Sequence, residues 1–416
     1  MTVPAIEYVS YADATGYGQA AAGYVRLLVL AGHQVHWTPY LNSTLWAGRI
    51  GREHAPRELV AARAALRTRG QAGKNNDLMT LIEATSRPMR PDLRILHVMP
   101  PFWEPLMRYA PGLPHLGMTV WETDGIAEAW QCPIASVRHL AVPCSHNIEL
   151  IAALRRQGRD LPPATLVPHV CRILRPPPPS RLDALAKWAG IRHGDTVFYS
   201  INAWDPRKRL AQLVDGFARA FSHDDPAVLL LKTSRLGLFD DPAGPSGTRD
   251  VASIVQAIIA RATTESGRHS GRIALLAEDD VPDSLIDGFH SLGHCFVSLS
   301  HCEGFGLGAF DAASLGRPVI SVGYGGPLDY LGQVWPGRIP HTMVPCQAIE
   351  GYWFDQGQSW PQPDDAAAFA IMRKVMADPI PFRVAAETIR QRIAVQFGQQ
   401  AVTERLSAAI TNTLST

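Results

Sequence analysis

The sequence predicts an α/β protein made of two Rossmann-like domains that face each other across a cleft. Three observations support this fold class. Short strand-like runs alternate with helical stretches, a glycine-containing loop follows the first strand, and four consecutive prolines divide the alternation into two halves. The length of 416 residues also suits two or three domains rather than one.

The first half opens with one strand–helix–strand unit. The run IEYVSY at 6–11 favours a strand, the loop at 15–19 contains two glycines, and small and apolar residues at 20–31 indicate a helix that Gly32 ends. Residues 34–38 indicate the next strand, and shorter strands are expected at 93–99, 117–121, 140–143 and 165–167. Strands that alternate with helices in this way typically pair in parallel.

The second half repeats this alternation after the proline run. Strands are expected at 196–201, 227–232, 272–276, 295–299 and 318–322, with a helix at 210–221. Pro176 to Pro179 cannot continue a helix and form a stiff, extended connector, so the domain boundary is placed there. We expect an N-terminal domain over residues 1–175, a C-terminal domain over 176–385, and a helical segment over 386–416 that packs back on the N-terminal domain.

The composition excludes several classes of protein. Lys plus Arg number 39 against 38 Asp plus Glu, which argues against a strongly basic nucleic-acid-binding protein. Hydrophobic residues make up 46% of the chain, so it is not disordered. No apolar run reaches the roughly 18 residues of a membrane span, and the N-terminus lacks the features of a signal peptide. The six cysteines form no CxxC pair, which favours a reducing cytosol, so we expect a cytoplasmic protein.

The strongest chemical signal is the run HCEGFGLGAFD at 301–311, between an expected strand and a helix that ends near residue 315. Its glycines let backbone N–H groups approach a ligand, and the helix start adds a positive dipole end, which suits a diphosphate. Carboxylates cannot bind phosphate, so Glu303 and Asp311 suit hydroxyls, one set on a sugar ring and one on a ribose. The alternative is an ordinary glycine turn with a solvent-facing Glu303 and a capping Asp311.

A second signal is the run NAWDPRKR at 202–209, between a strand and a helix. Its three cations, Arg207, Lys208 and Arg209, lie at the carboxyl end of a strand, where they suit a developing pyrophosphate. The alternative is a solvated helix N-terminus, but the helix dipole disfavours cations there.

A third signal is the acidic end of the expected strand at 117–121, which continues as Glu122, Thr123 and Asp124. A carboxylate at this point can orient a sugar hydroxyl, accept a proton, or stabilise an oxocarbenium-like charge. The alternative is a helix start in which Thr123 or Asp124 is the cap and Glu122 lies in the first turn. We assign Glu122 to the site and Asp124 to capping.

Three weaker features are also interpreted. His97, at the end of an early strand, is expected to be a satisfied core or cleft-lining histidine. The histidines and cysteines between 290 and 302 lack the spacing of a zinc site, so no metal is expected. Residues 49–74 hold seven cations against two acids, which indicates a solvated helix face or, functionally, contact with an acidic acceptor or an anionic membrane surface.

The glycine motif resembles the EGFG…E signature of retaining, GT-B-fold nucleotide-sugar glycosyltransferases of family 4, with Asp311 in place of the second Glu. The runs at 314–320, 323–327 and 360–364 resemble the continuation of the same family. The resemblance covers residues 196–370 well. It covers 1–175 loosely, through the loop with Gly16 and Gly18 and through residues 121–124.

The resemblance implies that the C-terminal domain binds a nucleotide diphosphate sugar and the N-terminal domain binds an acceptor, with retention of configuration, no catalytic metal and no cofactor. Lys208 matches the family's phosphate-binding Lys, Asn202 stands where its Arg is usual, and Arg207 or Lys232 is expected to supply the missing charge. Lys232 reads equally well as an ordinary strand-end lysine. Glu122 stands where many relatives have a His. The expected catalytic residues are Glu122, Lys208 and Glu303, and the expected substrate-binding residues are Gly16, Gly18, Asn202, Arg207, Lys208, Lys232, Glu303, Gly304, Phe305, Gly306, Leu307 and Asp311.

The predicted function is transfer of a hexosyl-type sugar to an acceptor hydroxyl of a glycan, a glycolipid or another acceptor, in polysaccharide or glycoconjugate synthesis. No nucleic-acid partner is expected, and peripheral contact with the inner face of an anionic membrane is an added expectation. Two other functions stay open on the sequence alone: a GT-B-fold phosphorylase or synthase-like enzyme, and a non-catalytic sugar-nucleotide binding protein.

Overall fold

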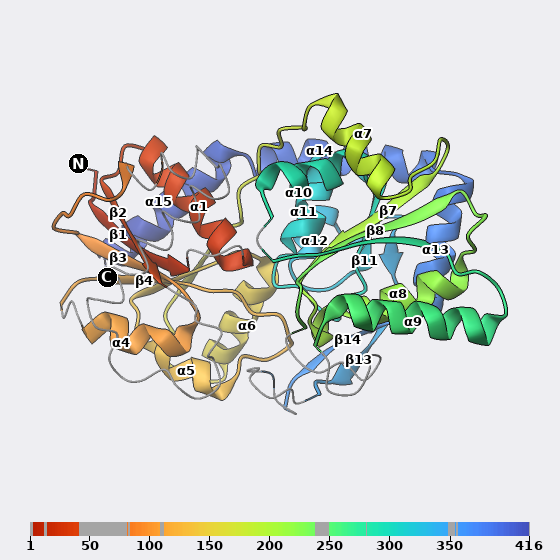
Figure 1. The fold of residues 1–416 in the computed structure, drawn as a ribbon. Coiled ribbons are helices and arrows are strands. Elements are labelled where there is room, and N and C mark those ends of the chain that lie inside the picture. Colours follow the sequence, from red (N-terminus) through yellow and green to blue (C-terminus); the bar gives the residue numbers. More distant parts are fainter. Residues whose placement is uncertain are drawn as a thin grey trace. The chain divides into compact units, whose positions relative to one another are not determined.

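The computed structural model describes residues 3–11, 15–40, 81, 84–108, 112–237, 249–279, 281–347, 354 and 357–415. The chain divides into two compact units. Unit 1 comprises Met1–Arg172, Pro345–Ser359 and Val395–Thr416, and unit 2 comprises Ile173–Val344 and Trp360–Ala394. Each unit contains a six-stranded parallel sheet with flanking helices (Figure 1), so the predicted α/β class with two Rossmann-like domains is confirmed.

The sheet of unit 1 has the strand order β2-β1-β3-β4-β5-β6, and every neighbouring pair is parallel. Its strands are β1 (Ile6–Tyr11), β2 (Val35–Tyr40), β3 (Leu93–His97), β4 (His115–Met118), β5 (His139–Val142) and β6 (Ala164–Leu166). Among the described residues, the helices of unit 1 are α1 (Gly16–Leu30), α4 (Trp103–Arg108), α5 (Glu128–Ala135), α6 (Ser145–Arg156) and α15 (Gln399–Ser415).

Two helices from opposite ends of the chain cover one face of this sheet. Apolar side chains of α1 and α15, such as Leu28 and Leu406, join one buried cluster with Tyr8 and Leu116 of the sheet. The opposite face at β4 is packed against α4, because a Cβ on Gly117 would lie 2.4 Å from the ring of Trp103. The C-terminal helix therefore completes the core of the N-terminal sheet.

The sheet of unit 2 has the order β12-β11-β10-β7-β8-β9 and is also parallel throughout. Its strands are β7 (Thr196–Ile201), β8 (Ala227–Thr233), β9 (Arg272–Ala277), β10 (Cys295–Val297), β11 (Val319–Val322) and β12 (Arg338–Ile339), and β13 (His341–Pro345) pairs separately with β14 (Ser359–Pro363). The helices are α7 (Pro179–Trp188), α8 (Leu210–Ala220), α9 (Val251–Ser266), α10 (Asp283–Leu292), α11 (Leu307–Ser314), α12 (Pro327–Leu331), α13 (Asp365–Ala377) and α14 (Ile380–Gln396).

The core of unit 2 lies between its sheet and α8, α9 and α13. Phe217, Ile254 and Met372, one from each helix, are buried in a single cluster with Leu229 of β8. Tyr199 of β7 faces the other way, where its hydroxyl is hydrogen-bonded to His290 Nδ1 of α10 at 3.0 Å. Both faces of the sheet are thus covered, as the apolar strands require.

The units differ from the predicted domain ranges in three places, one of which is the C-terminal segment, which joins unit 1 from Val395 rather than from residue 386. The division falls after Arg172, and the proline run belongs to unit 2, where Arg175 N–H donates to Asp287 of α10 at 3.3 Å and Pro179 is the first residue of α7. Proline is favourable at that position because its fixed φ suits a helix start. Residues 345–359 join unit 1, although they lie within the range predicted for the C-terminal domain.

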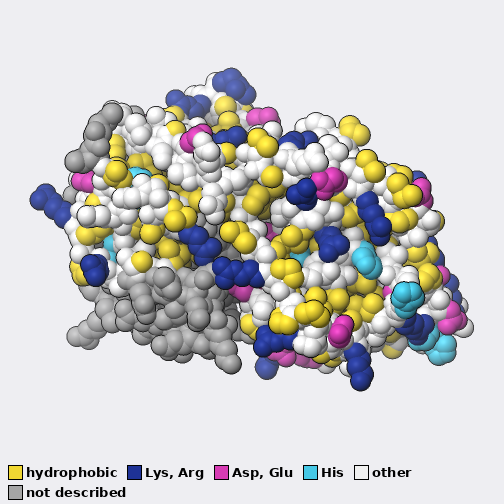
Figure 2. All heavy atoms as spheres, turned by 90° about the horizontal axis from the view of Figure 1, so that it is seen from above, with side chains coloured by type: hydrophobic (Ala, Val, Ile, Leu, Met, Phe, Trp, Pro, Cys, Tyr) yellow, Lys and Arg dark blue, Asp and Glu magenta, His cyan; other side chains and the backbone are white. Residues whose placement is uncertain are grey.

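The surface agrees with the near-zero net charge. On the face shown in Figure 2, Lys and Arg side chains are scattered among acidic, polar and apolar ones. The basic stretch at 49–74, on which the expected membrane contact depends, lies outside the described residues. Among the residues that are described, no helix combines the length and the apolar character that a bilayer crossing requires.

Candidate functional site

The carboxyl ends of β7 and β10 carry the two strongest sequence motifs, and these strands are neighbours in the sheet of unit 2. After β7 the chain forms a 3₁₀ turn at Pro206–Lys208, in which Asp205 caps the turn by accepting a hydrogen bond from Arg207 N at 2.8 Å. After β10 it enters the glycine motif. Strand pairing therefore brings the two loops together, as the sequence predicts for a parallel sheet.

Arg207 joins the two loops by reciprocal hydrogen bonds. Its carbonyl oxygen accepts from His301 N–H at 2.9 Å, and its Nη1 donates to the carbonyl oxygen of Cys302 at 2.6 Å. Its side chain is only 10% exposed. In this structure Arg207 supports the backbone that carries Glu303, in addition to placing charge beside it.

Glu303 and Lys208 form a largely enclosed ion pair. Lys208 Nζ lies 2.5 Å from Glu303 Oε2, Arg207 Nη1 lies 3.6 Å from the same oxygen, and both side chains of the pair are 13% exposed. Burial by itself would raise the pKa of Glu303, but Lys208 and Arg207 outweigh that effect and hold the pKa below its usual range. Glu303 is therefore ionised at neutral pH, and neither residue has the solvated character of the alternative interpretations.

Two positions in and beside the glycine loop require glycine. Gly306 has φ 79°, and a Cβ on Gly326 would lie 2.3 Å from the carbonyl oxygen of Gly304, because the 323–326 loop packs directly on this one. Leu307 begins α11, so the loop leads into a helix N-terminus, which favours anions. The side chain of Phe305 packs on Phe310 at 4.9 Å between ring centroids, so only its backbone is available to a ligand.

Asp311 lies inside α11 and is buried, so it is not a helix cap; Gly306 holds the N-cap position. Burial raises the pKa of Tyr330, and the charges of Glu303 and Asp311 raise it further, which places this phenol near both carboxylates. Tyr330 donates a hydrogen bond to the carbonyl oxygen of Gly306 at 3.2 Å. Tyr330 could not be singled out from the sequence, because it lies 24 residues beyond Gly306 of the glycine loop that it supports.

The other two predicted donor-site residues lie on adjacent strand ends. Asn202 N–H donates to the carbonyl oxygen of Lys232 at 3.2 Å, and the Asn202 side chain is hydrogen-bonded to Ser200 at 3.2 Å. Lys232 is half-buried within β8, one residue before its end. The structure therefore places both residues at the same sheet edge as Lys208. Substrate binding by Lys232 stays a prediction.

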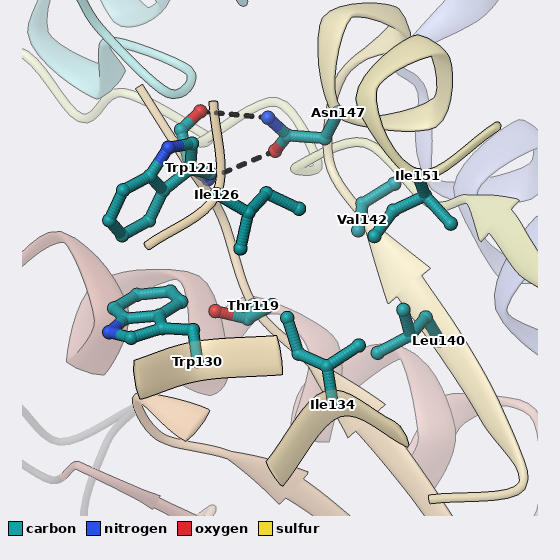
Figure 3. Close-up of a pocket in the computed structure, with 9 residues that line it drawn as sticks. All are labelled: Thr119, Trp121, Ile126, Trp130, Ile134, Leu140, Val142, Asn147 and Ile151. Atoms are coloured by element: carbon teal, nitrogen blue, oxygen red, sulfur yellow. Dashed lines mark hydrogen bonds between the residues drawn. The ribbon is translucent and has the colours of Figure 1, made fainter. Parts of the chain in front are cut away.

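In unit 1, Glu122 lies in a loop four residues beyond the end of β4, so the predicted strand was too long at its carboxyl end. The loop is held from two sides: Asn147 of α6 exchanges two hydrogen bonds with the backbone of Trp121, at 3.1 and 2.7 Å, and Tyr17 of α1 is hydrogen-bonded to Thr119 at 3.0 Å. Figure 3 shows the Trp121–Asn147 bonds at the edge of a small apolar pocket.

The helix-start interpretation of this loop is wrong, because α5 begins only at Glu128. Asp124 is instead hydrogen-bonded to the backbone of Ser359. Its carboxylate accepts from Ser359 N–H at 2.6 Å, and its own N–H donates to the carbonyl oxygen of Ser359 at 3.1 Å. Glu122 is half-buried, and its charge adds to the effect of burial in raising the pKa of Tyr17. Both acidic residues therefore lie in an ordered loop.

Gly16 and Gly18 do not form an open loop. They lie in the first turn of α1, where Thr15 is the N-cap and its hydroxyl accepts from Gly18 N–H at 3.4 Å. The helix thus begins four residues earlier than predicted. Substrate binding by these two glycines stays a prediction.

His97 and His169 are buried under the carboxyl end of the sheet of unit 1. His97 Nδ1 is hydrogen-bonded to the hydroxyl of Tyr8 at 2.7 Å, and His169 Nδ1 to that of Tyr24 at 2.9 Å. Burial lowers the pKa of each histidine to about 3, and the neighbouring His169 adds to the effect on His97. The expectation of a satisfied core histidine at position 97 is confirmed.

We expect acid to destabilise the fold through these histidines. Because the folded state keeps these histidines neutral, the unfolded chain binds protons below about pH 6.5 before the folded chain does. The free energy of unfolding then falls by up to about 1.4 kcal/mol per pH unit for each histidine. Their stabilising contribution is complete above about pH 6.5 and is lost as the pH falls toward their folded pKa of about 3. Melting temperatures between pH 7.5 and 5 should fall less steeply for His97→Gln than for wild type. The exposed His193→Gln is the control, and equal slopes for all three would contradict this origin.

Among the described residues, no group of three or more His, Cys, Asp or Glu side chains could hold a metal ion. His301 is instead stacked on Trp360, with 4.4 Å between ring centroids and an angle of 5°, and its Nδ1 is hydrogen-bonded to Pro361 O at 2.8 Å. None of the six cysteines, all of which lie in the described part of the chain, forms a disulfide.

No family model and no curated protein matches the sequence. Solved structures match the whole chain. Sucrose-phosphate synthase from Thermosynechococcus elongatus has a TM-score of 0.63 at 16% identity, with 99% of each chain covered. A glycosyltransferase from Rickettsia africae has a TM-score of 0.63 at 13% identity, covering 100% of this chain and 99% of that one. Anabaena HepE, solved in complex with UDP and glucose, has a TM-score of 0.60 at 13% identity, covering 98% and 99%. At such identities the likeness shows the fold alone: the chain has the GT-B glycosyltransferase fold.

Proposed function

We propose that the protein is a glycosyltransferase that moves a sugar from a nucleotide diphosphate sugar to an acceptor hydroxyl. One observation carries the proposal: an ionised, largely enclosed Glu303 is held by Lys208 and Arg207 beside a glycine loop that opens a helix. A sugar hydroxyl needs the carboxylate, and a diphosphate needs the cations and amides. The site contains both kinds of group side by side.

The proposed division of labour follows from charge. Lys208, Arg207 and the amides at 304–308 bind the diphosphate and stabilise its charge as the bond to the sugar breaks. Glu303 binds hydroxyls of the transferred sugar, and Asp311 binds the ribose. Glu122, in unit 1, is proposed to act on the acceptor side, by orienting a hydroxyl or accepting its proton.

Retention of configuration, hexosyl specificity and a role in polysaccharide, glycolipid or glycoconjugate synthesis are part of the proposal. Retention is supported by the resemblance of the 303–306 motif to retaining enzymes. The solved HepE complex, which contains UDP and glucose, makes UDP-sugars the first donors to test. Contact with an anionic membrane through residues 49–74 stays a prediction.

The proposal is tested with a panel of nucleotide sugars that differ in base and sugar. A ligand that binds the folded state raises the melting temperature by mass action. We expect one nucleotide sugar to stabilise the protein and to release its nucleoside diphosphate when acceptors are added. Stabilisation without any release across the panel would favour a non-catalytic binding protein instead.

We expect turnover to survive EDTA. Lys208 and Arg207 already neutralise the carboxylate in this site, and on donor binding their charge becomes available to the leaving diphosphate, the task that a metal performs in other transferases. Initial rates should agree within about twofold before and after chelation. A rate that falls on chelation and returns with Mn²⁺ or Mg²⁺ would show that a metal is required.

A further inference from the structure

Arg209 has an unusual backbone conformation. Among the described residues it alone, apart from glycines, has a positive φ, with φ 53° and ψ 37°. Left-handed conformations of residues with a Cβ persist only where the surroundings hold them, and they cluster at functional sites. Arg209 lies between the 3₁₀ turn that carries Lys208 and the start of α8.

The guanidinium of Arg209 does not face the diphosphate site with its two neighbours. It is buried and forms a bidentate ion pair with Asp365, with Nη1–Oδ1 at 2.7 Å and Nη2–Oδ2 at 2.8 Å. Asp365 is the first residue of α13. The expectation that all three cations serve a pyrophosphate is therefore wrong for Arg209, because its charge is already used by this carboxylate.

The pair is anchored to a rigid part of unit 2. Helices α8 and α13 pack so closely that a Cβ on Gly216 would lie 2.0 Å from the ring of Phe369. The backbone of Arg209 closes the preceding turn by donating to Pro206 O at 3.2 Å, and its carbonyl accepts from Leu213 N–H at 3.1 Å. The end of the turn is thus held by side chain and backbone together.

Three consecutive side chains leave this turn toward three different partners. Arg207 binds the carbonyl oxygen of Cys302, Lys208 binds Glu303, and Arg209 binds Asp365. Burial lowers the pKa of His301 to about 4, and Arg209 lowers it while Asp365 raises it, so the pair also lies near the loop that carries Glu303. The Arg209–Asp365 pair therefore lies next to both halves of the donor site.

We propose that the Arg209–Asp365 ion pair is a positioning device: it holds the turn in the left-handed bend that directs Lys208 and Arg207 at Glu303. The inference rests on the proposed function. Arg209 and Asp365 touch no substrate and act through Lys208 and Arg207.

The test uses Arg209→Gly, Asp365→Asn and the double variant. Glycine accepts a positive φ without strain, so Arg209→Gly should fold and melt within a few degrees of wild type. Misplacement of a catalytic group by about 1 Å can cost about 100-fold, so we expect kcat for the best nucleotide sugar to fall about tenfold or more in each single variant, with a smaller change in KM. Because both residues form one unit, the double variant should be no slower than the slower single variant.

A matched control is Arg219→Ala, which removes an ion pair from the other end of α8, where Arg219 contacts Asp215 at 2.8 Å and Glu265 at 2.7 Å. Its kcat should equal that of wild type.

Crystal structures of the two single variants give a readout that needs no activity: the Lys208–Glu303 contact should be lost or lengthened beyond 4 Å. If the contact persists in both, or if kcat is unchanged while only the melting temperature falls, the positioning role is refuted. Absence of nucleotide binding and turnover in the wild type would refute the proposed function, and the two crystal structures would still decide the positioning role.

Discussion

Replacing Lys208 with alanine is expected to lower nucleotide-sugar turnover about 100-fold or more. Its ammonium group lies 2.5 Å from Glu303 in a site where 13% of each side chain is exposed, so its charge is weakly screened. In the proposed reaction this charge passes to the diphosphate as the bond to the sugar breaks. Removing one such electrostatic stabiliser typically costs about 100- to 1,000-fold in kcat. Steady-state kinetics on the folded variant measure the effect.

The substitution also has an expected cost in stability, which has to be separated from the cost in rate. Without Lys208, Arg207 at 3.6 Å is the cation that remains beside Glu303, and an under-compensated enclosed carboxylate destabilises the fold by about 1–3 kcal/mol. The double variant Lys208→Ala/Glu303→Gln removes that charge, so its melting temperature should recover while its turnover stays low. If turnover recovered together with stability, Lys208 would be a structural residue.

A lysine outside the proposed donor site provides the matched control. Lys187 is exposed in the last turn of α7, in the same unit. Lys187→Ala should leave turnover unchanged, and Lys208→Arg, which keeps the charge with a different geometry, should retain more turnover than Lys208→Ala. Wild-type turnover in a folded Lys208→Ala protein would remove this residue from the reaction.

The parts of the fold that depend on local pattern could be predicted from the sequence. The strands Ile6–Tyr11 and Thr196–Ile201 were predicted to the residue, because apolar runs there are bounded by polar or glycine-containing loops. The proximity of the loops after β7 and β10 could be predicted as well, since parallel strands bring their carboxyl ends to one sheet edge. The run after β4 was extended too far, because Trp121 is apolar yet lies in a loop held by Asn147.

Contacts between residues far apart in sequence could not be predicted in the same way. The Arg209–Asp365 pair joins residues 156 positions apart, and nothing in either local sequence indicates the partner. The sequence analysis assigned Lys208 to the phosphates and Glu303 to a hydroxyl of the ligand. Their ion pair became visible only in the structure. The placement of residues 345–359 in unit 1 likewise depends on tertiary contacts, such as those of Ser359 with Asp124.

The ion pair between Lys208 and Glu303 leads to a second large effect, which concerns ligand binding. In this structure Lys208 is ion-paired with Glu303, so an incoming diphosphate has to compete with Glu303 for this cation. Glu303→Gln removes the competitor and keeps the shape of the side chain. We expect free nucleoside diphosphate to bind this variant at least as tightly as the wild type, while nucleotide-sugar turnover falls about tenfold or more, because hydrogen bonds to the sugar that involve a charged group are worth about 1.5–3 kcal/mol.

Asp311→Asn should behave differently. Asp311 is buried within α11 and is proposed to meet the ribose, which the free nucleotide and the nucleotide sugar share. Its replacement is therefore expected to weaken the binding of both ligands by a similar factor, which is about 10-fold for a loss of about 1.4 kcal/mol in binding free energy. Calorimetry with nucleoside diphosphate and with nucleotide sugar on each variant measures the two patterns.

The contrast between the two variants decides between an enzyme and a binding protein. Glu265→Gln, an exposed partner of Arg219 in the same unit, is the control and should change neither binding nor turnover. Weaker nucleoside diphosphate binding in Glu303→Gln, to the same degree as in Asp311→Asn, would mean that Glu303 does not compete for Lys208 and that the two carboxylates share one task. If both variants kept full turnover, the glycine loop would be structural. The difference expected between the two variants in free diphosphate binding follows from charge, since Glu303 is paired with the cation that the phosphates need.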